Sequence, residues 1–186
     1  MLLREISVTV LVATGLAGAL LLSGQHFSDP NTLAPAFPTP QTVVDQMLTL
    51  AKIKPGEMVF DLGCGDGRIV ITAAQQFHAR SVGIELRRDI YEKALAKVAS
   101  LGLADQVKIV HGDALHYDLS QADVVTLYLL TSSNERLKPI LEKQLKPSAR
   151  VVSHDFEIQG WKPTTVQKVV SDGRNHSIFV YTMNSR

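Results

Sequence analysis

A glycine-rich segment at residues 61–67 is the part of this sequence whose residue types and spacing best suit ligand binding. It reads Asp-Leu-Gly-Cys-Gly-Asp-Gly and follows a short apolar segment. Glycine at every second position allows tight turns and close approach of a ligand to the backbone, and the apolar residues 69–77 predict a helix whose N-terminus faces the loop. The G-x-G-x-G spacing differs from the G-x-G-x-x-G of a pyrophosphate site. The segment therefore predicts a cradle for a nucleotide-like cofactor, with the binding candidates Asp61, Leu62, Gly63, Gly65, Asp66 and Gly67.

Two further carboxylates follow the next two apolar segments. Glu85 follows residues 81–84, and Asp113, with Ala114 after it, follows residues 107–110. Because the carboxyl ends of parallel strands meet at one edge of a sheet, we expect both carboxylates near the glycine loop. Glu85 is then placed to accept from ribose hydroxyls and Asp113 from an adenine amine, while Asp61 or Asp66 would face an ammonium group. S-adenosylmethionine (SAM) has these three parts and no phosphate, so we predict it as the cofactor.

Strand-like and helix-like segments alternate along the chain and must position these residues. Strands are expected at 57–61, 81–84, 107–110, 124–130 and 150–156, and Thr39 is expected to cap a first helix. Two more strands, 164–170 and 177–182, flank an Asp-Gly turn. The pattern predicts an α/β fold, namely a Rossmann-like three-layer sandwich with a mostly parallel seven-stranded sheet and a C-terminal antiparallel hairpin.

Residues 61–67 resemble motif I of class I SAM-dependent methyltransferases, with Glu85 and Asp113 at the ribose and adenine positions of that family. Residues 124–130 and 150–156 resemble, more narrowly, a bacterial branch related to the mitochondrial lysine methyltransferases that act on ATP synthase c subunit and adenine nucleotide translocase. The resemblance covers almost all of residues 38–183. It implies a protein-lysine N-methyltransferase whose acceptor is a lysine of a membrane protein.

An acceptor site is expected at the carboxyl ends of the fourth and fifth strands. A lysine amine, with a pKa of about 10.4, must be neutral before it attacks, and oxygen atoms around it can orient its lone pair. Tyr128, Thr131 and Asp155 are the catalytic candidates. Tyr128 is equally well explained as a packing aromatic, and Thr131 with residues 132–134 as caps of the next helix. Neighbouring strand residues face opposite sides of a sheet, so we do not expect His154 to cooperate with Asp155 unless the chain bends there.

Residues 6–22 form an uncharged apolar run, about 17 residues long. That length is at the lower limit for a membrane span and slightly long for a secretory signal, so residues 1–24 are interpreted as an anchor or a signal segment, with the anchor preferred. A linker is expected at 25–38 and a SAM-dependent methyltransferase domain at 39–186. SAM is made in the cytosol, which favours a bacterial inner-membrane protein with a cytosolic catalytic domain. Arg4 favours the opposite orientation, and an exported form remains the alternative.

The amino-acid composition limits the kinds of partner and ligand that this chain is expected to bind. With 19 Lys and Arg against 18 Asp and Glu, the net charge is +1, and no basic field favours nucleic acid. A single cysteine excludes an internal disulfide and a Cys-rich zinc site, and His78, His111 and His116 lack metal-ligand spacing, so no metal is expected. Two alternatives to lysine methylation stay open: methylation of a small or lipidic molecule, and a non-catalytic SAM-binding sensor or assembly factor.

Overall fold

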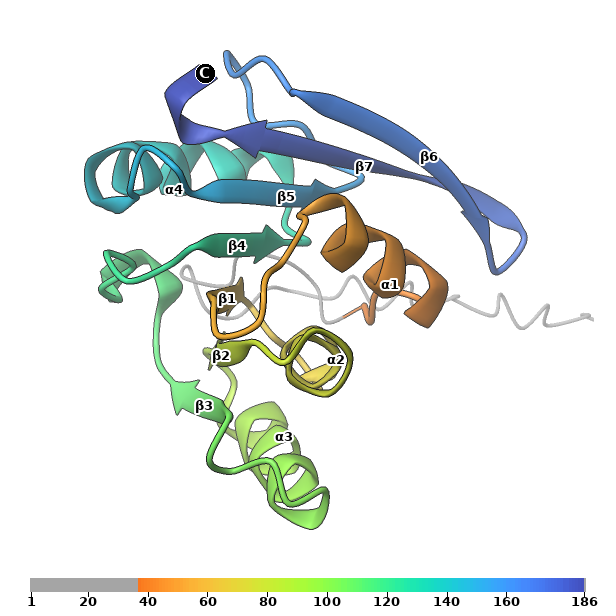
Figure 1. The fold of residues 1–186 in the computed structure, drawn as a ribbon, viewed down its shortest axis with the longest axis vertical. Coiled ribbons are helices and arrows are strands. Elements are labelled where there is room, and N and C mark those ends of the chain that lie inside the picture. Colours follow the sequence, from red (N-terminus) through yellow and green to blue (C-terminus); the bar gives the residue numbers. More distant parts are fainter. Residues whose placement is uncertain (1–36, 186) are drawn as a thin grey trace, which may run out of the picture.

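Short apolar strands form the centre of the fold, as expected for parallel strands covered on both faces. The computed structural model describes residues 37–185, and its strands are β1 (Met58–Leu62), β2 (Arg80–Glu85), β3 (Val107–His111), β4 (Val124–Leu127), β5 (Arg150–His154), β6 (Thr165–Ser171) and β7 (Arg174–Thr182). They form one sheet in the order β3-β2-β1-β4-β5-β7-β6 (Figure 1). Strands β1 to β5 are parallel, and β7 is antiparallel to β5 and β6. The predicted fold class is confirmed.

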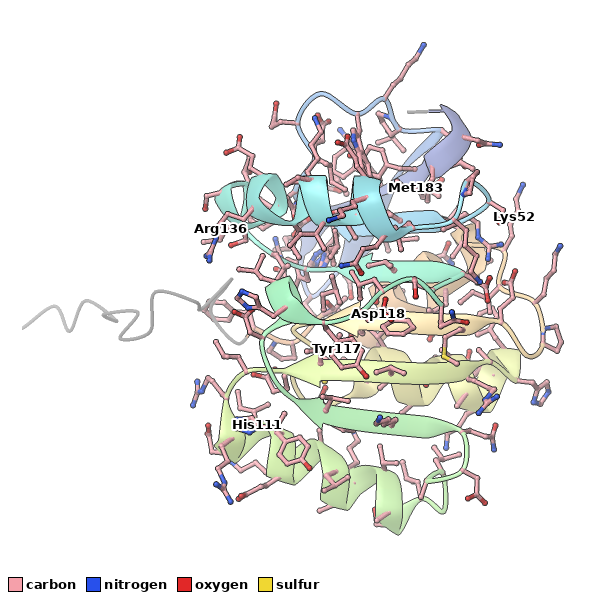
Figure 2. All side chains as sticks on the ribbon, turned by 90° about the vertical axis from the view of Figure 1, so that its left-hand side faces the viewer. Lys52, His111, Tyr117, Asp118, Arg136 and Met183 are labelled. Atoms are coloured by element: carbon pink, nitrogen blue, oxygen red, sulfur yellow. The ribbon has the colours of Figure 1, made fainter. Side chains whose placement is uncertain are left out.

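Helices cover the two faces of the sheet because alternate strand residues point to opposite sides. On one face lie α1 (Gln41–Leu50), α2 (Arg68–Phe77) and α3 (Arg88–Ser100), and on the other α4 (Thr131–Gln144) and the 3-10 turn η1 (Ala114–His116). Val59 packs with α1 and α2, whereas its neighbour Phe60 packs with α4. Side chains fill both spaces between sheet and helices (Figure 2). A second 3-10 turn, η2 (Met183–Ser185), follows β7.

The order of the strands reverses beside β1. From β1 the chain proceeds outward to β2 and β3, then returns to place β4 on the other side of β1. In open α/β sheets such a reversal leaves a crevice at the carboxyl ends of the strands, where ligands bind. The ends of β1, β2 and β4 therefore define where a site should lie.

Two predicted helix caps are wrong. Thr39 does not cap α1, because Pro40 holds the N-cap position and the Thr39 hydroxyl lies 3.2 Å from Nδ1 of His154 instead. Leu130 is the N-cap of α4, so residues 131–134 already belong to its first turn. Asn134 is buried there and donates to the carbonyl of Phe156. Long-range tertiary contacts at both sites replaced the local capping bonds that the sequence favoured.

The apolar run at residues 6–22 lies outside the described residues. Within residues 37–185, none of the helices has the length and apolar character that a membrane span requires. The expectation of an anchor therefore stays a prediction from the sequence.

Substitution of Gly83 tests how closely β2 packs against the loop that follows β1. A Cβ atom at Gly83 would lie 2.7 Å from Sγ and 2.8 Å from Cβ of Cys64, so Gly83→Ala must displace the loop. We expect a loss of about 1–3 kcal/mol in the free energy of unfolding, measured by urea denaturation. Gly112→Ala is the control, because its Cβ would meet nothing closer than 3.8 Å. Equal stability of the two variants would contradict the packing described.

Candidate functional site

A loop of three glycines connects β1 to α2 and forms the floor of the site. Gly63, Gly65 and Gly67 have φ values of +80°, +55° and +77°, a region that residues with a Cβ atom rarely adopt. The N–H groups of Gly63 and Cys64 both donate to the carbonyl of Ile84, at 2.9 and 3.0 Å. The loop is thus fixed to β2, and the N-terminus of α2 follows directly from it.

A cavity of about 340 Å³ lies at the carboxyl ends of β1, β2 and β4. Most of the predicted cofactor-binding residues line it, namely Asp61, Gly63, Gly65, Asp66, Glu85, Asp113 and Ala114. Leu62 and Gly67 lie outside the lining: Leu62 is fully buried in the core below the loop, and Gly67 is the N-cap of α2. These residues come from three separate segments that meet at the strand-order reversal, as expected for the carboxyl ends of parallel strands.

Asp61 and Glu85 are nearly buried carboxylates with different partners. Asp61 is 3% exposed and accepts a 2.7 Å hydrogen bond from the hydroxyl of Thr126. Burial raises the pKa of its carboxyl to about 7, and the nearby carboxylate of Glu85 adds to the shift. Glu85 accepts from the backbone N–H groups of Gly65 and Arg87, each at 2.9 Å. Its carboxylate thus holds the glycine loop in addition to facing the cavity.

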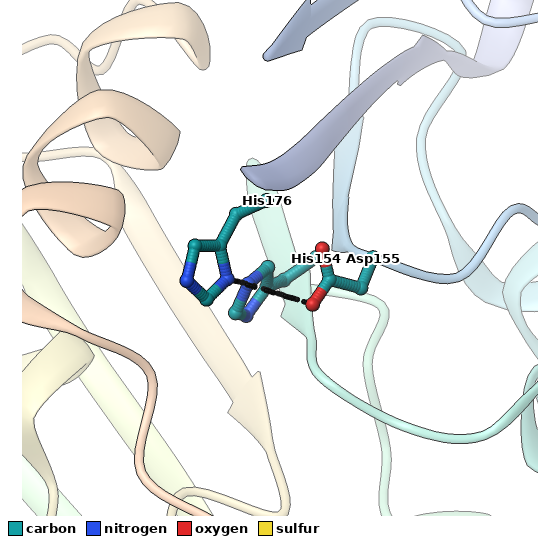
Figure 3. A group of neighbouring side chains, drawn as sticks. All are labelled: His154, Asp155 and His176. Atoms are coloured by element: carbon teal, nitrogen blue, oxygen red, sulfur yellow. Dashed lines mark hydrogen bonds and ion pairs between the residues drawn. The ribbon is translucent and has the colours of Figure 1, made fainter. Parts of the chain in front are cut away.

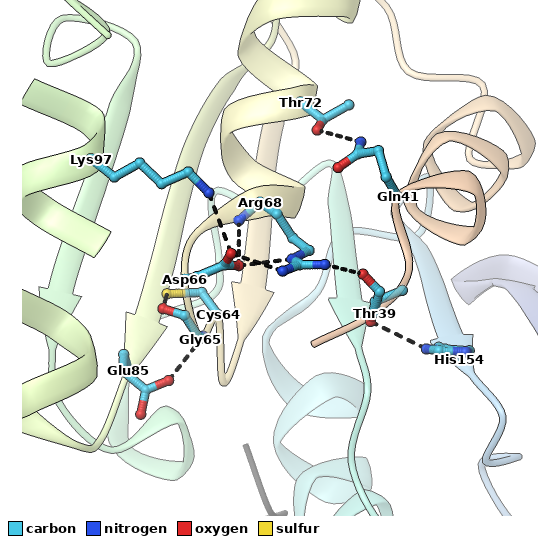
Figure 4. Close-up of polar contacts among 10 residues, drawn as sticks. All are labelled: Thr39, Gln41, Cys64, Gly65, Asp66, Arg68, Thr72, Glu85, Lys97 and His154. Atoms are coloured by element: carbon cyan, nitrogen blue, oxygen red, sulfur yellow. Dashed lines mark hydrogen bonds and ion pairs between the residues drawn. The ribbon is translucent and has the colours of Figure 1, made fainter. Parts of the chain in front are cut away.

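The carboxylates of Asp66 and Asp113 form ion pairs and hydrogen bonds with neighbouring residues of the protein. Asp66 forms ion pairs with Arg68 at 2.9 Å and Lys97 at 3.3 Å (Figure 4). Partial burial alone would raise the pKa of Asp66, but hydrogen bonding to Arg68 and the two nearby cations hold it below the usual value. Asp113 accepts from the N–H of Leu115 and lies 3.0 Å from Nδ1 of His116. Of the four cavity carboxylates, Asp61 and Glu85 are the two that are buried.

Residues just before α1 form part of the cavity wall, which the sequence did not indicate. Phe37, Pro38 and Thr39 line the cavity, although the first two fall in the predicted linker. The carbonyl of Thr39 accepts a 2.7 Å hydrogen bond from the guanidinium of Arg68 (Figure 4). Because Arg68 also pairs with Asp66, this arginine joins the segment to the glycine loop. No local pattern could have revealed a contact between residues so far apart in the sequence.

Tyr128, just beyond β4, is the one of the three catalytic candidates that lines the cavity. Its ring lies against the buried imidazole of His154, with centroids 3.9 Å apart. Its hydroxyl accepts a 3.1 Å hydrogen bond from the guanidinium of Arg174. Burial lowers the pKa of His154 to about 4, so this imidazole is neutral at physiological pH. Tyr128 can therefore pack against His154 through its ring and still present its hydroxyl group as the catalytic candidate expected from the sequence.

Asp155 and Thr131 lie outside the cavity lining. Asp155 accepts from the N–H of Ser177 and pairs with Arg174 at 3.1 Å. Its φ of +60° turns the chain directly after β5, which brings Oδ2 within 3.3 Å of Nε2 of His154. This bend is the condition under which the two side chains were expected to come together, since an extended strand would direct them to opposite faces. Thr131 is the first residue of α4 and is half-buried.

Comparison with known proteins identifies the family. The model of the ANTKMT methyltransferase domain matches residues 61–165, from the end of β1 to the start of β6. A protein-lysine N-methyltransferase of Saccharolobus islandicus is 48% identical over 150 residues, which cover 80% of this chain and 93% of the relative. The chain belongs to the ANTKMT methyltransferase family. The mouse adenine nucleotide translocase lysine N-methyltransferase is 33% identical to this methyltransferase over 123 residues, 66% of this chain and 53% of the mouse protein.

A solved structure with the same fold indicates the cofactor of this methyltransferase. A Salinibacter ruber protein described as an RNA methyltransferase, in complex with S-adenosylhomocysteine, is 45% identical and superposes with a TM-score of 0.74. The match covers 81% of this chain and 95% of that one. The protein is a SAM-dependent methyltransferase, and the predicted enzyme class and cofactor are confirmed.

The raised pKa of Asp61 predicts pH-dependent cofactor binding. We propose that Asp61 faces the ammonium group that SAM and S-adenosylhomocysteine share; above pH 7 its carboxyl is ionised and would attract that group, whereas below pH 7 the neutral acid predominates. Affinity for S-adenosylhomocysteine should therefore fall as the pH falls from 7 to 5, by up to about tenfold per unit. Isothermal titration calorimetry measures this slope. The Asp61→Asn variant should bind S-adenosylhomocysteine weakly at every pH and show no such slope. The same slope in that variant would refute the assignment.

Glu85 is proposed to hold the ribose hydroxyls. Glu85→Gln keeps the size of the side chain but removes the charge and one acceptor, and hydrogen bonds to charged groups contribute about 1.5–3 kcal/mol. We expect affinity for S-adenosylhomocysteine to fall by roughly 10- to 150-fold. Since Glu85 also holds the glycine loop, thermal unfolding without ligand must be compared. Unchanged affinity in a variant of unchanged stability would defeat the assignment.

Proposed function

We propose that this methyltransferase methylates a lysine side chain of a membrane protein. The observation that carries the proposal is the position of Tyr128, which lines the cofactor cavity while its hydroxyl bonds a cationic side chain, that of Arg174. An oxygen that holds one cationic nitrogen there is suited to orient the nitrogen of a substrate lysine. The relatives named as lysine N-methyltransferases, one of them for adenine nucleotide translocase, support the same acceptor.

In the proposed arrangement, Asp61 faces the cofactor's ammonium group, Glu85 its ribose, and Asp113 with Ala114 its adenine. The glycine loop brings backbone against the cofactor, with Leu62 and Gly67 fixing its two ends. Asp66 acts through Arg68, which keeps Thr39 over the cavity. The activated methyl group then points toward the side of the cavity that Tyr128 forms.

SAM supplies a methyl group on a sulfonium, so the protein has to position the acceptor rather than activate the donor. The lysine ammonium must first release a proton to solvent, so that the side chain reaches the methyl group as a neutral amine. The nitrogen lone pair then forms the bond to carbon as the carbon–sulfur bond breaks, and the sulfur leaves as a neutral thioether. Tyr128 would accept a hydrogen bond from the amine and so aim its lone pair at the methyl carbon.

Asp155 and Thr131 take positioning roles in this proposal. Asp155 holds Arg174, the same guanidinium that bonds Tyr128, and so fixes the charge beside the acceptor. Thr131, at the start of α4, would contact the substrate near the mouth of the cavity. Methylation of a small or lipidic molecule is the competing function.

We further propose that residues 6–22 anchor the enzyme in the bacterial inner membrane, with the catalytic domain on the cytosolic side. A short anchor would confine the enzyme to the surface where its substrates lie. The prediction is that the full chain sediments with membrane vesicles, whereas a chain that begins at Phe37 stays in the supernatant. Sedimentation of both would contradict an anchoring role for this segment.

Transfer of radiolabelled methyl from SAM tests the function. The chain from Phe37, which keeps the whole cavity wall, is incubated separately with membrane proteins, soluble proteins, lipid and RNA. We expect label in a membrane-protein band and, after hydrolysis, in methyl-lysine. Label only in lipid would favour the competing function, and label only in RNA, the acceptor named for the Salinibacter relative, would overturn the lysine assignment.

Tyr128→Phe is the matched variant for this assay, because it keeps the ring that packs on His154 and removes the hydroxyl. We expect turnover to fall at least tenfold, the loss that corresponds to about 1.4 kcal/mol of transition-state stabilisation, while S-adenosylhomocysteine binds as before. Equal turnover of the wild type and Tyr128→Phe would show that the hydroxyl group plays no part in catalysis and that Tyr128 serves only in packing.

A further inference from the structure

Three side chains that could bind a metal ion converge beside the cofactor cavity. His154 ends β5, Asp155 follows it, and His176 lies on the adjacent strand β7 (Figure 3). Both imidazoles are fully buried, and the Asp155 side chain is 16% exposed. Nε2 of His154 lies 2.8 Å from Nδ1 of His176 and 3.3 Å from Oδ2 of Asp155, and the third distance is 3.5 Å.

Tautomers that leave all three atoms unprotonated would direct three lone pairs at one point. Nδ1 of His154 is 3.2 Å from the Thr39 hydroxyl, so a neutral His154 that donates there presents a lone pair at Nε2. Nε2 of His176 is buried without a hydrogen-bond partner among the described residues, and a His176 that carries its proton on this nitrogen presents a lone pair at Nδ1. In these tautomers the lone pairs of His154 Nε2, His176 Nδ1 and Asp155 Oδ2 face one another across 2.8 to 3.5 Å. This arrangement favours a cation at the centre.

A divalent metal ion fits these distances. With metal–ligand bonds of about 2.0–2.1 Å, tetrahedral geometry separates neighbouring ligand atoms by about 3.3 Å. Two of the three distances already match, and the histidine pair would have to open from 2.8 Å. The Thr39 hydroxyl is placed to accept from the other ring nitrogen of His154, as an oxygen commonly does for metal-bound histidine.

We propose that His154, Asp155 and His176 bind one divalent transition-metal ion, of which Zn²⁺ is the best match to two imidazoles and a carboxylate. The ion joins the end of β5 to β7, and through His154 it fixes the ring of Tyr128. It therefore acts as a structural clamp beside the acceptor side of the cavity, and methyl transfer itself needs no metal.

Arg174 is the nearest competitor of the ion. Its guanidinium lies 3.1 Å from the Asp155 oxygen that would bind the metal, and its side chain is 54% exposed. Metal binding would repel this charge and turn it toward solvent. Removal of the arginine should therefore strengthen metal binding, an effect opposite to that of removing a ligand.

Zinc binding by the full-length protein tests the site. The protein is stripped with EDTA, dialysed and titrated with ZnCl₂ by calorimetry, and bound zinc is counted by mass spectrometry. We expect one Zn²⁺ per chain and a higher melting temperature with zinc. Asp155→Asn and His176→Gln should weaken zinc binding at least tenfold, Arg174→Gln should strengthen it, and His116→Ala, which alters an exposed histidine, should leave it unchanged.

Circular dichroism of each variant without metal separates loss of the site from loss of the fold. No saturable binding by the wild-type protein, or equal binding by folded Asp155→Asn and wild type, would overturn the proposal. The readout is metal content and stability, so it is independent of whether lysine is the methyl acceptor.

Discussion

The close approach of the glycine loop to β2 is the constraint on which the site depends. Two consecutive N–H groups of the loop donate to one carbonyl, that of Ile84, and this is feasible because Gly83 leaves room for Cys64 above β2. The three left-handed glycines let the chain turn back into α2 within a few residues. As a result Asp61 at the end of β1 and Glu85 at the end of β2 lie on the same side of the loop. The cavity exists because backbone, rather than side chains, occupies its floor.

This geometry brings several negatively charged side chains together, and most of them are compensated by cations or hydrogen-bond donors. Bringing several carboxylates to one edge of a sheet is unfavourable unless each finds a partner. Asp66 has two cationic side chains, Asp113 caps a turn, and Glu85 accepts from two backbone N–H groups. Asp61 has a hydroxyl and no cation among its described contacts to offset its burial, and burial raises the pKa of its carboxyl. A cofactor with a positive charge would remove this strain, which couples ligand binding to the ionisation of one buried group.

Local patterns were sufficient to predict the fold and to predict which carboxylates meet at one edge of the sheet. Strand, glycine loop and helix follow one another in the sequence, and the carboxyl ends of parallel strands must meet, so the positions of Asp61, Glu85 and Asp113 follow from local pattern alone. The surroundings of Tyr128 depend instead on contacts between distant segments. The packing of Thr39 against His154, the bond from Arg174 to Tyr128 and the turn at Asp155 have no local signature. His154 and His176 come together only because β7 inserts antiparallel beside β5.

A crystal structure of the enzyme with S-adenosylhomocysteine would test the central claim most directly, namely that the cofactor lies on the glycine loop with its reactive sulfur directed toward Tyr128. We expect the ribose hydroxyls within hydrogen-bonding distance of Glu85, the amino group near Asp61 and the sulfur on the Tyr128 side of the cavity. A cofactor whose sulfur points away from Tyr128, or whose ribose lies far from Glu85, would contradict it.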